Sequence, residues 1–228
     1  MNDKVVFSVK SLKDIMVVID HFDSYPLISK KQADFKLFKA VIQLMCSKEH
    51  LVEEGLHKII SIRASLNNGL SDKLNTSFPN TVPVNKPIVK DTEIKDVQWL
   101  IGFTTGEGCF LIDTYKAKTK VGVGVTLRFK IAQHSRDADL LKSFVTFLGC
   151  GSYVPKSKYD IGEFVVSKFE DNIFKIIPLF EKYPVLGIKS QDFLDFKKAA
   201  ELIKNKAHLE ESGLAKILLI KSGMNRGR

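Results

Sequence analysis

Residues 126–131 alternate strictly between polar and apolar side chains. This period of two predicts a half-buried strand with Leu127, Phe129 and Ile131 on its buried face. The strand is expected to extend over 121–134. Three further strand-like stretches are predicted at 110–116, 151–155 and 162–168.

Helix-forming segments separate these strands. A short, mostly apolar helix is predicted over 97–107, and a second over 137–148, with Ser135 as its N-cap and Gly149 as its stop. The order α-β-β-α-β-β-α predicts an α+β fold, in which helices lie on one face of a four-stranded antiparallel sheet. Trailing helices are expected over 170–182, 190–206 and 210–222.

The chain also contains an internal repeat. SYPLISKKQADFKLF at 24–38 aligns with KYPVLGIKSQDFLDF at 182–196, at an offset of 158 residues. About a third of the positions from 5 to 70 are identical at this offset without a gap, which indicates a duplication. The first copy is predicted to consist of one strand at 5–10 and helices near 11–22, 30–47, 52–66 and 71–77.

The duplication predicts three parts in the chain. Residues 1–78 are expected to form the C-terminal half of a first repeat, because the counterparts of residues 91–162 would precede Met1. The segment 79–96, PNTVPVNKPIVKDTEIKD, contains three prolines and is predicted to be an extended linker. Residues 97–228 are expected to form a complete second repeat.

Composition narrows the possible functions. Lys and Arg number 35 against 26 Asp and Glu, which gives a net charge of +9. Such a balance suits a polyanion partner, although a merely solubilising basic surface explains it equally well. No apolar run is long enough for a membrane span, and the first residues form no signal peptide. The three cysteines have neither CxxC nor Cys/His spacing, which argues against a disulfide framework and a zinc site.

The segment WLIGFTTGEGCF at 99–110 carries the candidate chemistry. Gly102 and Gly106 are four residues apart and share one helix face, where a partner helix could approach closely. Glu107 falls at the C-terminal end of the helix, where the helix dipole disfavours an anion. A divalent cation beside the carboxylate would explain this placement, because Mg²⁺ prefers oxygen ligands. A surface glutamate beside a helix-ending glycine is the other explanation.

This segment resembles the motif helix of LAGLIDADG homing endonucleases, in which the acidic residue before the last glycine binds the catalytic metal. Glu107 matches that position. The YPL…KKQADF…KEHL…GL…I segment and its second copy resemble the repeat ends of single-chain, fungal mitochondrial, intron-encoded members. The resemblance covers almost the whole chain. It implies a motif helix at 99–108, a divalent metal such as Mg²⁺ as cofactor, and a mitochondrial protein. The scarcity of Arg, five residues in all, also suits an AT-rich organellar gene.

The sequence departs from the family in one respect. Single-chain members carry two motif helices, packed through their glycines, with one acidic residue from each beside the scissile phosphates. Only one such helix is found here. The resemblance therefore implies that full activity needs the missing N-terminal half-repeat or a second chain, and that this chain alone is deficient in double-strand cleavage.

In the family, outward side chains of the sheets contact double-stranded DNA. The outward positions predicted by strand alternation carry groups that suit base edges or phosphates. Lysines in the neighbouring loops would contact phosphates, with ordinary solvated lysines as the alternative for any one of them. The expected DNA-binding set is Asp113, Tyr115, Lys116, Lys118, Lys120, Thr126, Arg128, Lys130, Lys156, Lys158 and Lys168.

The repeat also pairs Lys31 with Lys189, each near the start of a helix, where a cation is unfavourable. The resemblance suggests that both lysines act near the active site, by stabilising charge on the phosphate or by lowering a water pKa. A salt bridge to Asp34 or Asp192 is an equally good explanation.

Two function classes follow from these features. The first is a site-specific endonuclease that hydrolyses phosphodiester bonds of a long DNA target with divalent metal. The alternative is a maturase, which would bind intron RNA as a splicing cofactor without using Glu107. An inert fragment is the third possibility.

Overall fold

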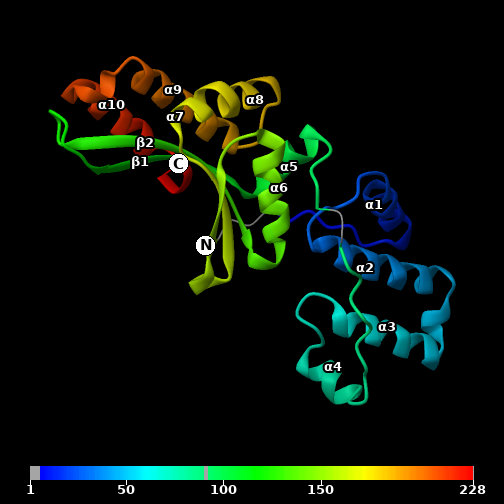
Figure 1. Ribbon diagram of the computed structural model, residues 1–228. Helices are drawn as coiled ribbons and strands as arrows, with labels where there is room; N and C mark the ends of the chain where they lie inside the picture. The colour runs from blue at the N-terminus through cyan, green and yellow to red at the C-terminus, as the bar shows by residue number, and fades with distance from the viewer. Residues whose placement is uncertain (1–5, 90–91, 228) are drawn as a thin grey trace. The chain divides into compact units, whose positions relative to one another are not determined.

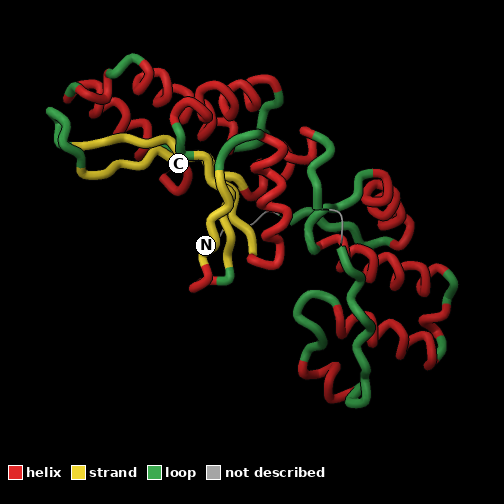
Figure 2. Tube along the Cα trace, in the orientation of Figure 1, coloured by secondary structure: helices red, strands yellow, loops and turns green. Residues whose placement is uncertain are grey.

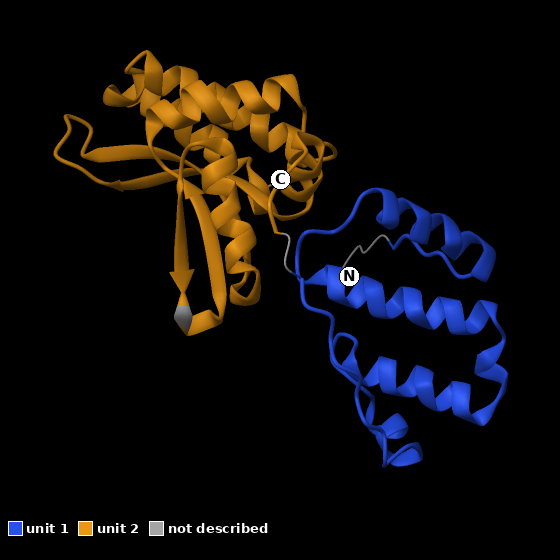
Figure 3. Cartoon of the chain, turned by 45° about the vertical axis from the view of Figure 1, so that its right-hand side comes forward, with its two compact units in different colours: residues 1–91 blue, residues 92–228 orange. Residues whose placement is uncertain are grey.

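The computed structural model describes residues 6–89 and 92–227, with the side chain of Ser157 left out of the description. The chain divides into two compact units, Met1–Asp91 and Thr92–Arg228 (Figure 3). Over the described ranges, no helix is both long and apolar enough to cross a bilayer. The three cysteines are free thiols.

The second unit contains a four-stranded sheet in which each neighbouring pair of strands is antiparallel, as predicted (Figure 2). The strand order β1-β2-β4-β3 places β1 at one edge and β4 in the interior. The long alternating strand begins at Val123, later than expected, after a turn that includes Gly122 with φ 71°. The strands are β1 (Gly108–Lys116), β2 (Val123–His134), β3 (Ser152–Lys156) and β4 (Ile161–Val166).

Helices cover the apolar face of this sheet (Figure 1). Phe110 of β1 meets Phe129 of β2 at 5.3 Å and Phe180 and Phe196 of the covering helices at 5.2 and 5.4 Å, measured between ring centroids. The predicted inward residues of β2, which include Phe129, are all fully buried. The helices are α5 (Val97–Glu107), α6 (Ala138–Leu148), α7 (Phe169–Asp171), a π-helical turn (Asn172–Ile176), α8 (Ile177–Lys182), α9 (Lys189–Lys204) and α10 (Glu211–Ser222).

The predicted cap of α6 is wrong. Ser135 does not cap this helix, because Ser135–Asp137 forms a separate 3₁₀ turn before it. The Nδ1 of His134 accepts the backbone N–H of Arg136 and caps that turn instead. Ser135 thus lies near the start of α6, but the 3₁₀ turn separates it from the first residue of that helix.

The first unit is helical, with α1 (Leu12–Ser24), α2 (Lys31–Cys46), α3 (Glu53–Ser65) and α4 (Asp72–Ser77). Its small core centres on Ile19, Phe35 and Ile42. The strand predicted at 5–10 is not formed by residues 6–10, while Val5 lies outside the described residues. Phe7 is 92% exposed. A strand needs a hydrogen-bonded neighbour, and the partners that β2 and β3 provide for β4 have no counterpart among the described residues of this unit.

Backbone geometry follows the internal repeat. Both α2 and α9 contain 16 residues and begin at the paired lysines. Lys48 and Lys206, at the same offset, share the left-handed conformation with φ 61° and 57°. At Gly213, an added Cβ would lie 2.0 Å from the Ala207 carbonyl oxygen, so only glycine allows the helix to pack on the preceding turn. Some residues that are identical in the two copies, such as Lys48 and Lys206, therefore give equivalent turns the same backbone conformation.

Candidate nucleic-acid interface and catalytic carboxylate

Helix α5 places Glu107 at its last position, as predicted. The Asp96 side chain caps the helix start by accepting the backbone N–H of Gln98. The Glu107 side chain is exposed, and none of the described residues forms a hydrogen bond or ion pair with it. Its carboxylate is therefore free to take an external cation.

The two glycines of α5 lie on an open face. A Cβ added at Gly102 or at Gly106 would meet nothing within 4 Å. The opposite side of the helix is buried through Leu100, Ile101 and Thr104. Trp99 and Phe103 flank the glycines, stack on each other at 4.7 Å and both approach Phe144 of α6. Nothing within the described part of this unit thus requires glycine at 102 or 106.

Glu107 alone fits part of a magnesium site. Among the described residues, no group of three or more His, Cys, Asp or Glu side chains could together hold a metal ion. Mg²⁺ commonly takes one or two carboxylates and completes its shell with water and phosphate oxygens. Glu107 would supply one carboxylate oxygen, and water and phosphate oxygens could complete the shell.

Lys189 contacts the main chain directly after Glu107. It is the first residue of α9, and its Nζ donates a hydrogen bond to the carbonyl oxygen of Gly108, the residue after Glu107. Carbonyls two residues apart in a strand point to the same edge, and that of Phe110 accepts the Nδ2 of Asn225 at 3.0 Å. Lys189 and Asn225 thus hold the free edge of β1 directly after Glu107.

Asn225 is a site residue that sequence reasoning missed. Its backbone N–H donates to Asp192 Oδ1 at 2.9 Å, and the Cys109 thiol reaches its Oδ1 at 3.2 Å. Burial raises the pKa of that thiol, although the charges of Lys189 and Lys130 act in the opposite direction. The available signal in the sequence was the identity of Asn225 with Asn67 at the repeat offset. In the structure both residues have positive φ.

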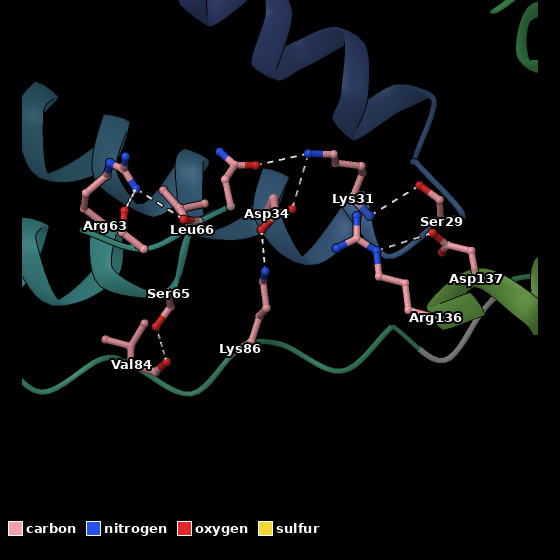
Figure 4. Close-up of polar contacts among 12 residues, drawn as sticks. Ser29, Lys31, Asp34, Arg63, Ser65, Leu66, Val84, Lys86, Arg136 and Asp137 are labelled. Carbon is pink, nitrogen blue, oxygen red and sulfur yellow. Dashed lines mark hydrogen bonds and ion pairs between the residues drawn. The ribbon is translucent and has the colours of Figure 1, made fainter. Parts of the chain in front are cut away.

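The corresponding cluster in the first unit has different partners (Figure 4). Lys31 begins α2, and its Nζ donates to Asn67 Oδ1 at 3.1 Å and lies 3.7 Å from Asp34 Oδ2. Lys86, which follows α4 in the chain, lies 2.7 Å from Asp34 Oδ1. Burial raises the pKa of Asp34, but the hydrogen bond and charge of Lys86, the backbone N–H of Asn67 and the charge of Lys31 together outweigh it, so the net pKa is lowered. Lys31 thus forms an ion pair with Asp34, whereas Lys189 donates to a main-chain carbonyl.

The predicted outward residues of β1 and β2 lie on the sheet face opposite the core. Asp113 pairs across the strands with Thr126, and its carboxylate accepts a hydrogen bond from the Arg128 side chain. A hollow of about 530 Å³ opens on this face, lined by Asp113, Arg128, Lys156 and Glu163 among others.

Glu163 is a second residue that sequence reasoning missed. It is an outward residue of β4, and its carboxylate accepts Lys130 Nζ at 3.0 Å and lies 3.7 Å from Lys156 Nζ. The sequence placed it in a strand, but only the strand register brings it between the two lysines.

The loop lysines are more dispersed. Lys116 and Lys118 are exposed, and Lys120 lies 3.2 Å from Glu210. Lys158 lies over the Tyr159 ring at 5.6 Å, and Lys168 is exposed just before α7. The structure therefore gathers the predicted sheet residues and Lys156 on one face, but it does not collect all the loop lysines with them.

Comparison with known proteins gives a consistent result. A model of the family described as LAGLIDADG endonuclease matches residues 1–42 and 100–200. Probable intron-encoded endonuclease 2 of Neurospora crassa is 40% identical over 98% of this chain, but the match covers only 51% of that relative. The chain therefore spans about half the length of that curated relative.

Solved structures agree with the fold. The I-SmaMI LAGLIDADG homing endonuclease bound to cleaved DNA has a TM-score of 0.94 at 40% identity, covering 99% of this chain and 77% of that one. I-SmaMI bound to uncleaved DNA target in the presence of calcium ions has a TM-score of 0.93 at 39% identity, with 98% and 78% covered. From the family match and these similarities, the chain belongs to the LAGLIDADG endonuclease family.

Proposed function

We propose that this chain is part of a homing-type endonuclease that hydrolyses phosphodiester bonds of a long double-stranded DNA target with Mg²⁺. The observation that carries the proposal is the unpartnered carboxylate of Glu107 at the end of the motif helix, beside the carbonyl that Lys189 holds. Family membership supports the reaction class, and the DNA-bound relatives support the choice of ligand.

Glu107 would provide a carboxylate ligand for the metal. The bound ion would supply Lewis-acid stabilisation and an activated water for hydrolysis. Lys189 has three ammonium N–H donors and uses one of them on Gly108, so two remain for a phosphate oxygen on which charge develops. Lys31 would serve the equivalent role in the first unit, where its present partners are Asn67 and Asp34.

The polar face of the sheet would contact the DNA. Arg128 and Lys130 suit guanine O6 and N7, and Asp113 suits cytosine N4. Tyr115 and Thr126 lie on the same side of the sheet and line the hollow. The lysines around it would meet phosphates, and each contact would make affinity depend on salt. These are Lys116, Lys118, Lys120, Lys158 and Lys168. Lys156 would contact DNA beside Lys130, since both lysines lie against Glu163.

Full activity would require a second motif helix. The open face of Gly102 and Gly106 would receive that helix, because two backbones can approach closely where both lack side chains. It would come from the half-repeat that residues 92–162 represent in the second copy, or from another chain. We also propose that the chain is organised in three parts, at 1–78, 79–96 and 97–228. A mitochondrial location is proposed because the relative from Neurospora crassa is an intron-encoded fungal protein.

The test uses two forms of the protein. The first is the chain itself, and the second is a completed chain in which residues 92–162 are duplicated directly before Val5, as the offset of 158 dictates. Each is presented with a randomised duplex library in Ca²⁺ to select bound targets, and these targets are then incubated with Mg²⁺. We expect both forms to bind and only the completed chain to cut both strands. Binding of neither form to any duplex would refute the proposed function.

A further inference from the structure

Glu163 forms ion pairs with lysines of the two neighbouring strands. It lies on interior strand β4, where its register partners are Ala132 on β2 and Val154 on β3. One carboxylate oxygen accepts Lys130 Nζ from β2 at 3.0 Å, and the other lies 3.7 Å from Lys156 Nζ on β3. The Glu163 side chain is 17% exposed, so its charge is largely removed from water and depends on these two partners.

The lysines of the β1–β2 hairpin are in a different state. Lys116 and Lys118 are exposed, and the described residues offer them no ion pair or hydrogen bond. A mobile, solvated ammonium can follow a phosphate wherever the backbone runs. Lys130 and Lys156 instead have their ammonium groups anchored to one acid. The face thus carries free cations at its rim and anchored cations within it.

Anchoring changes which DNA groups the lysines can bind. An ammonium has three N–H donors, so Lys130 can keep one on Glu163 and offer the others to neutral acceptors such as guanine O6 and N7. A phosphate gains less from the same lysine, because the negatively charged carboxylate of Glu163 repels it. Glu163 also already neutralises part of the lysine's positive charge. The acid therefore favours base edges over phosphates at these two positions.

We infer that Glu163 is a specificity-determining residue that anchors Lys130 and Lys156 and suppresses sequence-independent binding of phosphates. This inference rests on the proposed DNA-binding function. It concerns which duplexes are bound, not the hydrolysis step. Because phosphate contacts release counterions and neutral base contacts do not, the effect is measurable as a salt dependence.

The experiment measures log Kd against log salt concentration for a random duplex and for a selected target. Glu163→Gln keeps the shape of the side chain and releases both lysines. The slope for the random duplex should steepen by up to about 1.8, or about 0.9 for each released lysine, and affinity at low salt should rise about tenfold. Affinity for the selected target should rise less, so discrimination between the two duplexes falls.

Glu170→Gln is the matched control, since it makes the same charge change at an exposed glutamate at the start of the helical segment after β4. It should leave the slope unchanged. In a chain that also carries Lys130→Met and Lys156→Met, Glu163→Gln should have no effect on the slope. Emission of Trp99 and far-UV circular dichroism verify that each variant is folded.

The outcomes separate the inference from the function on which it rests. If the unmodified chain binds duplex DNA but Glu163→Gln has the slope of Glu170→Gln, the inference is overturned and the proposed function stands. An effect of Glu163→Gln that persists without the two lysines also overturns it. If the unmodified chain shows no salt-dependent binding to any duplex, the proposed function itself fails, and the inference fails with it.

Discussion

Replacement of Asn225 tests how the edge strand after Glu107 is held. Asn225 bonds the Phe110 carbonyl through Nδ2, approaches Cys109 through Oδ1, and donates its backbone N–H to Asp192. Its φ is 56°, in the left-handed region that glycine adopts without strain and alanine does not. Two substitutions therefore separate the side-chain bond from the backbone conformation.

The magnitudes follow from these contacts. Asn225→Gly keeps the backbone conformation but leaves the carbonyl of fully buried Phe110 without its side-chain donor, a loss of about 1–3 kcal/mol in the free energy of unfolding. Asn225→Ala adds the strain of a positive φ, about 1 kcal/mol more. Asn67→Gly is the matched control in the first unit. It loses only a bond to exposed Lys31, worth below about 1 kcal/mol.

Urea unfolding provides the assay. Trp99 is the chain's single tryptophan and lies in α5, so its fluorescence reports on the second unit, while far-UV circular dichroism follows both units. The expected order of destabilisation is Asn225→Ala, then Asn225→Gly, then Asn67→Gly. The reasoning would be refuted if Asn225→Gly left the Trp99 transition unchanged, or if it cost no more than Asn67→Gly.

Two further predictions concern stability. Because the pKa of Asp34 is lowered in the folded chain, its pairing with Lys86 stabilises the protein above the pKa of the unfolded state. The stability gap between wild type and Asp34→Asn, about 1 kcal/mol at neutral pH, should begin to narrow below about pH 4 and close once pH falls below the folded pKa. A gap in urea titrations that stays constant with pH would contradict this. Gly213→Ala should destabilise the protein strongly, because its Cβ would lie 2.0 Å from the Ala207 carbonyl oxygen. Gly102→Ala should stabilise this chain by about 1 kcal/mol in the same urea assay, because alanine favours the helix and its Cβ meets nothing within 4 Å. Equal effects of the two substitutions would show the packing argument to be wrong.

Local sequence patterns predicted much of the second unit. Strict alternation assigned Leu127, Phe129 and Ile131 to the core, because period two follows directly from strand geometry. Gly102, Gly106 and Glu107 could be placed on α5 because helix boundaries depend on nearby residues, here the Asp96 cap and Gly108. These features need no knowledge of the distant chain.

The remaining features depend on contacts between distant segments. The 6–10 segment has strand-like residues, but residues 6–89 and 92–227 offer it no partner strand, so pairing and not local propensity decides its conformation. Glu163 meets Lys130 and Lys156 only through the register of three strands. Asn225 reaches the β1 edge over 115 positions of sequence, and a repeated identity alone does not reveal its partner.

The most direct test of the central claim is Mg²⁺-dependent cleavage by the completed chain before and after Glu107→Gln. This substitution removes the charge of the carboxylate but changes the side-chain volume little, so DNA binding should be preserved. We predict that the completed chain cuts its selected target only with divalent metal, and that Glu107→Gln binds the same target with equal affinity and yields no double-strand product. Cleavage by Glu107→Gln at the original rate would contradict the assignment of Glu107 as the metal-binding acid.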